Sequence, residues 1–152
     1  MKRIALLVLL AFVLGTGCTT LESEPAPAVG AAPGNVDLVV HAVGFKHTRG
    51  HAVARLFAPG DDLMGPGRAE VKADVHGSEA TLSFPGLVPG SYAVLVFHDE
   101  NDNGTLDHGV FGPIEPTGLS DGVGHGHFGP PSFDKAKFEL SPEKAQVEIA
   151  VQ

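Results

Sequence analysis

The sequence has no tryptophan, one cysteine and few basic residues, and the last two shortages each exclude a class of protein. A single cysteine cannot form a disulfide within the chain, nor a zinc site built from several thiolates. The 152 residues contain 10 Lys and Arg against 18 Asp and Glu, so the chain lacks the basic surface that binds nucleic acid. The length and an apolar content of 43% instead predict one globular domain.

The N-terminal residues have the composition of an export signal. Lys2 and Arg3 precede an unbroken apolar run over residues 4–14, which is too short for a spanning helix of about 20 residues. The only cysteine, Cys18, follows the small residues of a cleavage region, and this arrangement resembles a bacterial lipoprotein signal. We therefore predict a signal peptide over residues 1–17 and lipidation of Cys18. The alternative is an ordinary secretory signal with an incidental cysteine.

Lipidation would anchor the protein to a membrane of the cell envelope, in the periplasm or at the outer membrane. Within residues 18–34, the segment after Cys18 is rich in Pro and Ala and nearly lacks large apolar side chains. Such a composition cannot bury a core and predicts a flexible tether. The folded domain is therefore expected over residues 35–152.

Short alternating apolar runs indicate an all-β fold for this domain. Seven segments have the character of strands: residues 36–43, 51–57, 70–75, 80–84, 92–97, 135–140 and 146–151. The fifth segment is apolar on both faces and is predicted to be central. The pattern predicts a seven-stranded immunoglobulin-like or transthyretin-like β-sandwich. Before the fifth segment, Pro89-Gly90 predicts a turn, after which Tyr92 packs its ring and bonds nearby backbone through its hydroxyl.

The sequence HDENDNGTLD at residues 98–107 has the spacing of a cation loop. Calcium takes about six to eight oxygen ligands, which alternate side chains of a tight loop supply. Asp99, Asn101 and Asn103 occupy positions 1, 3 and 5 of such a loop, followed by a glycine at position 6. Thr105 would contribute its backbone carbonyl, and Asp107 its side chain directly or through water.

The loop is not a complete EF-hand, because position 12 is Val110 and not glutamate. The missing ligands are expected from elsewhere, with Glu115 and Asp121 as the nearest candidates. Between Lys72 and Lys135 there are nine acidic residues and no Lys or Arg. Crowded carboxylates repel one another unless a cation or protons neutralise them, which favours bound calcium. The alternative is a solvated acidic hairpin turn.

No regular element is evident between residues 99 and 133, and loops of this length are usually functional or disordered. A bound cation at the base of the loop would order it. The segment 108–133 would then form a surface for a protein or glycan partner.

Three runs in this region carry a family resemblance: GSYAVLVFHDENDNGTLD, FGPIEPTGLS and GPPSFDKAKF. In these runs the chain resembles an uncharacterised bacterial family, the domain of unknown function 2141. The resemblance covers residues 35–152, and the segment 90–138 carries nearly all of it. It implies an exported, small all-β domain, and it implies no activity.

The eight histidines offer a different metal chemistry. Imidazole suits copper, nickel and zinc, and the candidate ligands are His98, His108, His125 and His127. The alternative is a Gly/His loop without fixed geometry.

The sequence gives no support for an enzyme. No G-x-S-x-G motif of a serine hydrolase occurs, and the one thiol is assigned to the lipid and cannot act as a nucleophile. General acid catalysis needs a carboxyl group with a raised pKa, and an open Asp/Asn loop does not raise it.

We therefore expect a protein that is not an enzyme. The first hypothesis is a calcium-stabilised interaction module of an envelope lipoprotein. The alternatives are a transition-metal protein that uses the histidine loop, and a metal-free structural scaffold.

Overall fold

The computed structural model describes residues 35–110, 112–120 and 131–152. The predicted signal peptide, the lipidation site and the tether lie outside these described residues, as do Asp121, His125 and His127. The described residues form ten strands and one helix of four residues. Within these ranges, no helix has the length and apolar character needed to cross a membrane.

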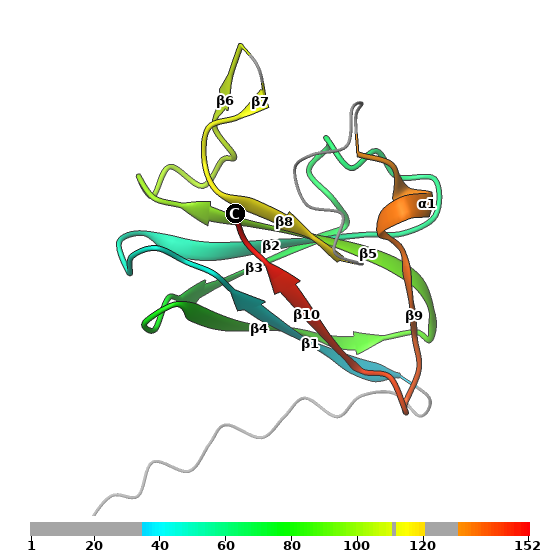
Figure 1. The fold of residues 1–152 in the computed structure, drawn as a ribbon. Coiled ribbons are helices and arrows are strands. Elements are labelled where there is room, and N and C mark those ends of the chain that lie inside the picture. Colours follow the sequence, from blue (N-terminus) through cyan, green and yellow to red (C-terminus); the bar gives the residue numbers. More distant parts are fainter. Residues whose placement is uncertain (1–34, 111, 121–130) are drawn as a thin grey trace, which may run out of the picture.

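The strands form two layers that enclose the core (Figure 1). The first sheet has the order β10-β1-β4, with β1 at Val36–Val43, β4 at Glu79–Leu87 and β10 at Gln146–Ala150. The second has the order β3-β2-β5-β8, with β2 at His51–Phe57, β3 at Ala69–Asp74, β5 at Gly90–Asp99 and β8 at Thr117–Leu119. Strand β9, Phe138–Leu140, also pairs with β5. Strands β6, His108–Gly109, and β7, Gly112–Pro113, form a small hairpin.

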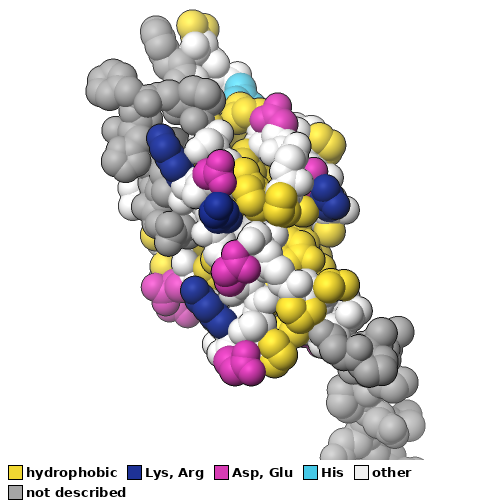
Figure 2. All heavy atoms as spheres, turned by 90° about the vertical axis from the view of Figure 1, so that its right-hand side faces the viewer, with side chains coloured by type: hydrophobic (Ala, Val, Ile, Leu, Met, Phe, Trp, Pro, Cys, Tyr) yellow, Lys and Arg dark blue, Asp and Glu magenta, His cyan; other side chains and the backbone are white. Residues whose placement is uncertain are grey.

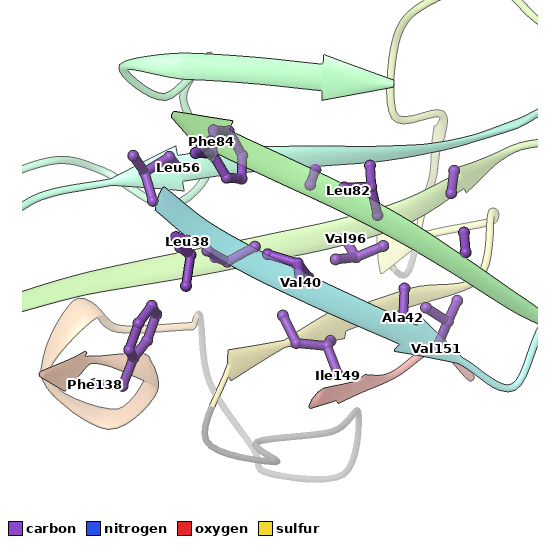
Figure 3. Packing of buried hydrophobic residues seen from close by; sticks show 14 of the residues in the cluster. Leu38, Val40, Ala42, Leu56, Leu82, Phe84, Val96, Phe138, Ile149 and Val151 are labelled. Atoms are coloured by element: carbon purple, nitrogen blue, oxygen red, sulfur yellow. The ribbon is translucent and has the colours of Figure 1, made fainter. Parts of the chain in front are cut away.

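The core lies between the two sheets and is built from the alternating apolar residues of the strands (Figure 3). Leu38 and Val40 of β1 are fully buried, as are Val94 and Val96 of β5 in the other sheet. Burial of one such side chain contributes about 1.5–3 kcal/mol. The predicted all-β sandwich is therefore confirmed, and the two-residue period of the sequence is what selects its inward faces.

Strand β5 is buried on both faces, as predicted for a central strand. Its even-numbered residues from Val94 face the core between the sheets, and Ala93 and Leu95 pack into a second cluster with Phe57 and Ala136. The predicted corner before this strand is also confirmed, because the Tyr92 hydroxyl donates a hydrogen bond of 2.9 Å to the Val88 carbonyl.

The structure differs from the sequence expectation between residues 99 and 140. The expected irregular loop contains β6, β7 and β8. Strand β8 exists because it pairs with β5 and because Thr117 and Gln152 exchange two backbone hydrogen bonds, at 3.1 and 3.2 Å. These partners are distant in sequence, and the three residues of β8 are too few to show an alternating pattern of their own.

The expected strand over residues 135–140 was partly wrong. It begins as helix α1, Phe133–Ala136, and only β9 is extended. The alternation of buried residues survives, since Ala136 and Leu140 are 1% and 2% exposed. Ser120 anchors this segment, because its hydroxyl donates to the Ala136 carbonyl at 2.6 Å and accepts from the Val94 amide at 2.9 Å.

Charged side chains are interspersed by sign on the side of the molecule where α1 and β9 lie (Figure 2). One exposed pair holds the turn that follows β2. The Arg68 guanidinium donates two hydrogen bonds to the Asp61 carboxylate, at 2.7 and 3.1 Å, and Ala58 N donates a third at 2.8 Å. These donors hold the pKa of Asp61 below its usual value.

Candidate cation site

The predicted cation loop begins where β5 ends. The chain leaves β5 and continues through residues 100–107 into the β6–β7 hairpin (Figure 1). The start of β2 lies beside it, because His51 is the register partner of Asp99. An open pocket here is lined by residues that include Arg49, Glu100 and Glu115.

Asp99 is fully buried and its carboxylate organises the loop. Its Oδ1 accepts a hydrogen bond from Asn103 N at 3.1 Å, and its Oδ2 accepts one from Gly104 N at 2.8 Å. The Lys72 ammonium lies 3.6 Å from Oδ2. Gly104 has φ +75°, a left-handed conformation that glycine adopts without a Cβ penalty. The residue predicted at position 1 therefore holds the bend at position 6.

The side chains predicted at positions 3, 5 and 9 converge. Asn101 Nδ2 donates to Asp107 Oδ2 at 2.7 Å, and Asn103 Nδ2 lies 3.1 and 3.2 Å from the two carboxylate oxygens of Asp107. Asn101 Oδ1 shares the Asn103 amide with Asp99. The structure thus brings together all four predicted side-chain ligands, Asp99 included.

Thr105, predicted to contribute its carbonyl, and Glu115 also form hydrogen bonds that hold the loop together. The amide and hydroxyl of Thr105 both donate to Asn103 Oδ1 at 2.8 Å. Glu115 is only 8% exposed, and its two oxygens accept Glu100 N and Asp107 N, each at 3.1 Å. Glu115 therefore joins the two ends of the loop, a role that its sequence position did not indicate. Asp121 lies outside the described residues.

The negative charge of the loop is only partly balanced. Asp102 is paired with His51, and Glu100 lies near His47 and Arg49. Across the ranges that the structure describes, no basic side chain forms an ion pair with Asp107 or Glu115. Their carboxylates are stabilised by neutral N–H groups alone, which leaves a net negative site beside the pocket.

Of the four histidines predicted as transition-metal ligands, the structure describes His98 and His108, and it does not group these two with each other. His98 is fully buried, and His108 is exposed in β6 with its Nδ1 2.8 Å from the Leu106 carbonyl. Among the described residues, His98 instead groups with His47 and Glu100. Glu100 could have been found from the H-x-E spacing at the end of a strand, because residues two apart share a face. No local signal indicated His47, which lies in the connection between β1 and β2.

A family model described as "Uncharacterized protein conserved in bacteria (DUF2141)" matches residues 40–148. The comparisons with curated proteins and with solved structures found no match.

Proposed function

The chain belongs to the DUF2141 family of uncharacterised bacterial proteins, and from its own residues we propose that it is a calcium-stabilised module of a cell-envelope lipoprotein. In this proposal the protein is not an enzyme. The cation binds in the loop that follows β5, and Cys18 carries the lipid that anchors the protein.

The observation that carries the proposal is the convergence of Asn101, Asn103 and Asp107 beside the buried carboxylate of Asp99. The side-chain amides of Asn101 and Asn103 meet at the Asp107 carboxylate, which forms no ion pair with a basic side chain within the described part of the chain. Oxygen-rich groups of this kind suit calcium, which accepts irregular geometry and completes its shell with water.

The amide groups of the two asparagines are already held in place. The Oδ1 atoms of Asn101 and Asn103 each accept a backbone N–H from the residue two positions later. Asn101 Oδ1 keeps a second lone pair for a cation, whereas on Asn103 Oδ1 the cation would replace the Thr105 hydroxyl, which can rotate away. Little ordering of the loop would therefore be needed on binding, which supports a structural role for the ion.

The bound cation would stabilise the segment that follows. Asp107 precedes β6 directly, and Ile114 N donates to the Asp107 carbonyl at 3.0 Å. The β6–β7 hairpin exposes Val110 and Ile114, which are 93% and 70% accessible. Exposed apolar side chains on an ordered hairpin support the segment 108–133 as the surface for a protein or glycan partner.

Calcium is expected to raise the melting temperature of the full-length protein above its value in EDTA. A ligand that binds only the folded state contributes about 2.7 kcal/mol at a hundredfold excess over Kd. For a domain of this size the shift is on the order of 10 °C. Asp107→Asn removes one charge from the site and should abolish most of the shift. Glu143→Gln makes the same change at an exposed position away from the loop, and should leave the shift intact.

The controls of this melt separate the competing functions. Magnesium should act more weakly, because it demands near-octahedral geometry and dehydrates reluctantly. A melting temperature that is the same in EDTA and in calcium would refute the calcium site and favour the metal-free scaffold. A calcium shift that persists in Asp107→Asn would place the cation elsewhere on the molecule.

The lipoprotein part of the proposal rests on Cys18 and is tested separately. Cys18→Ser removes the only thiol of the chain and hence the point of lipid attachment. In cells that express the full chain, we expect the protein to move from the membrane fraction to the soluble envelope fraction. Thr19→Ser changes the neighbouring residue and should leave the protein with the membranes. Membrane association that survives Cys18→Ser would refute the lipid anchor.

A further inference from the structure

We propose that His47, His98 and Glu100 form a second metal site, which binds a divalent transition ion such as Zn²⁺ independently of the calcium loop. One ligand atom of each of these residues lies within 4.8 Å of the other two. The proposal rests on the hydrogen-bonding state of His98 and on the position of Glu100.

The geometry determines which nitrogen of His98 carries the hydrogen. Nε2 lies 2.7 Å from the Arg49 carbonyl oxygen, which can only accept a hydrogen bond. Nε2 must therefore be the donor, and in neutral imidazole Nδ1 then carries a lone pair. The ring is fully buried, and its Nδ1 has no hydrogen-bond partner among the described residues.

This lone pair faces a second acceptor. His98 Nδ1 lies 3.8 Å from Glu100 Oε1, too far for a hydrogen bond. A buried lone pair without a donor is costly, and an adjacent carboxylate oxygen increases the cost. A cation between Nδ1 and Oε1 removes both costs, because it accepts electron pairs from the two atoms.

His47 supplies the third ligand atom. Its Nε2 is 3.2 Å from the same Glu100 oxygen, and its ring centroid is 4.8 Å from that of His98. For a tetrahedral zinc ion with bonds of about 2.0–2.1 Å, ligand atoms are roughly 3.3 Å apart. The distance of 3.2 Å from His47 to Glu100 matches this value, whereas the 3.8 Å distance and the spacing of up to 4.8 Å within the group are longer. Side-chain rotations that bring His47 and Glu100 toward the rigid ring of His98 would close the site.

The surroundings of His98 match those of a metal-bound histidine. Such a ligand usually donates its other ring N–H to a carbonyl or carboxylate, which fixes its orientation. Here the Arg49 carbonyl has that role, and Phe45 packs edge-on against the ring at 5.1 Å. His98 is therefore held rigidly before any ion binds.

Two imidazoles and one carboxylate favour zinc or another borderline ion over calcium, which prefers oxygen. Glu100 is 30% exposed and lines the open pocket, so water can occupy the fourth position. This arrangement allows the ion to enter from solvent and to exchange.

The proposed zinc and calcium sites lie on opposite faces of one strand. Residues of β5 alternate, so His98 shares the inward face of Val96, whereas Asp99 faces the other side. The zinc site uses nitrogen ligands that the calcium site lacks. The two proposals can therefore fail separately.

The test is a calorimetric titration of the full-length protein with Zn²⁺ at pH 7.5. We expect one equivalent of Zn²⁺ to bind tightly. His47→Gln and Glu100→Gln should each weaken binding roughly 10–100-fold, the loss typical of damage to a metal site. His76→Gln replaces an exposed histidine outside the group and should bind as the unaltered protein does. The calcium-dependent melting shift should survive in His47→Gln, which shows that the fold and the calcium loop are intact.

Nitrogen NMR supplies the sharper readout. On addition of Zn²⁺, the Nδ1 resonance of His98 should move to the position of a metal-bound nitrogen, while Nε2 keeps its proton. Binding that is lost in a His125→Ala and His127→Ala double variant, but kept in His47→Gln, would overturn the proposal in favour of the histidine loop. If the spectra show a hydrogen on His98 Nδ1 and no Zn²⁺ binds, the zinc site is refuted, and a proton fills the space between His98 and Glu100.

Discussion

Gly50→Ala is expected to lower the free energy of unfolding by roughly 2–5 kcal/mol, because two independent costs coincide at this position. Gly50 has φ +76°, and the left-handed conformation costs an L-residue about 1–2 kcal/mol. A Cβ would also lie 1.9 Å from the Asp99 carbonyl oxygen and 2.9 Å from the Glu100 Cα. Overpacking against backbone adds about 1–3 kcal/mol, since backbone cannot rotate away.

This substitution should disturb both proposed sites at once. The start of β2 would have to move away from the end of β5, where Asp99 and Glu100 lie. Arg49, whose carbonyl orients His98, is the neighbour of Gly50. Urea denaturation should therefore report the loss of stability, and titration should report weaker binding of calcium and of zinc.

Gly77→Ala is the matched control for this experiment. Gly77 also has a left-handed φ, +65°, but nothing lies within 4 Å of a Cβ placed there. We expect only the conformational cost, about 1–2 kcal/mol, and unchanged metal binding. Equal losses of stability in the two variants would mean that the close approach of β2 to β5 contributes nothing.

Asp99→Ala is expected to lower the free energy of unfolding by roughly 2–4 kcal/mol and to abolish the calcium-dependent melting shift. The buried carboxylate accepts the amides of Asn103 and Gly104, and a buried donor left without an acceptor costs about 1–3 kcal/mol. Lys72 would also lose the carboxylate that lies 3.6 Å away. Thermal melts in EDTA and in excess calcium measure both effects.

Two further variants identify the cause of any change. Asp99→Asn keeps the shape but replaces one acceptor oxygen with a donor, so it should destabilise less than alanine and still lose the calcium shift. Asp134→Ala removes an exposed carboxylate in α1, and a surface change of this kind is usually within about 0.5 kcal/mol. A calcium shift of unchanged size in Asp99→Ala would exclude this residue as a ligand.

Much of the candidate site could be predicted because it is local. Asp99, Asn101, Asn103 and Asp107 lie within nine residues of sequence, and apart from the ion pair of Asp99 with Lys72 their side chains bond one another or groups of the same loop. Spacing alone therefore specified which side chains converge. The role of Glu115 was missed because it lies beyond the loop and reaches its amides only after the chain turns back.

The proposed zinc site could not be predicted, because its residues are not all local in sequence. His47 and His98 are 51 positions apart in the sequence, and no motif or spacing links them. They meet only because the pairing of β2 with β5 brings the β1–β2 connection to the end of β5. The same closure places Gly50 against Asp99. Such contacts depend on the pairing of β2 with β5, and no stretch of local sequence records that pairing.

The sequence by itself determined the longer strands, their inward faces, the corner at Tyr92 and the order of polar residues in the loop, because each follows from local periodicity or turn chemistry. Only the tertiary structure decided the parallel pairing of β10 with β1, the existence of β8 and the meeting of His47, His98 and Glu100. The physical reason is that these features are stabilised by hydrogen bonds and packing between distant segments, which form only once the two sheets have closed on their common core.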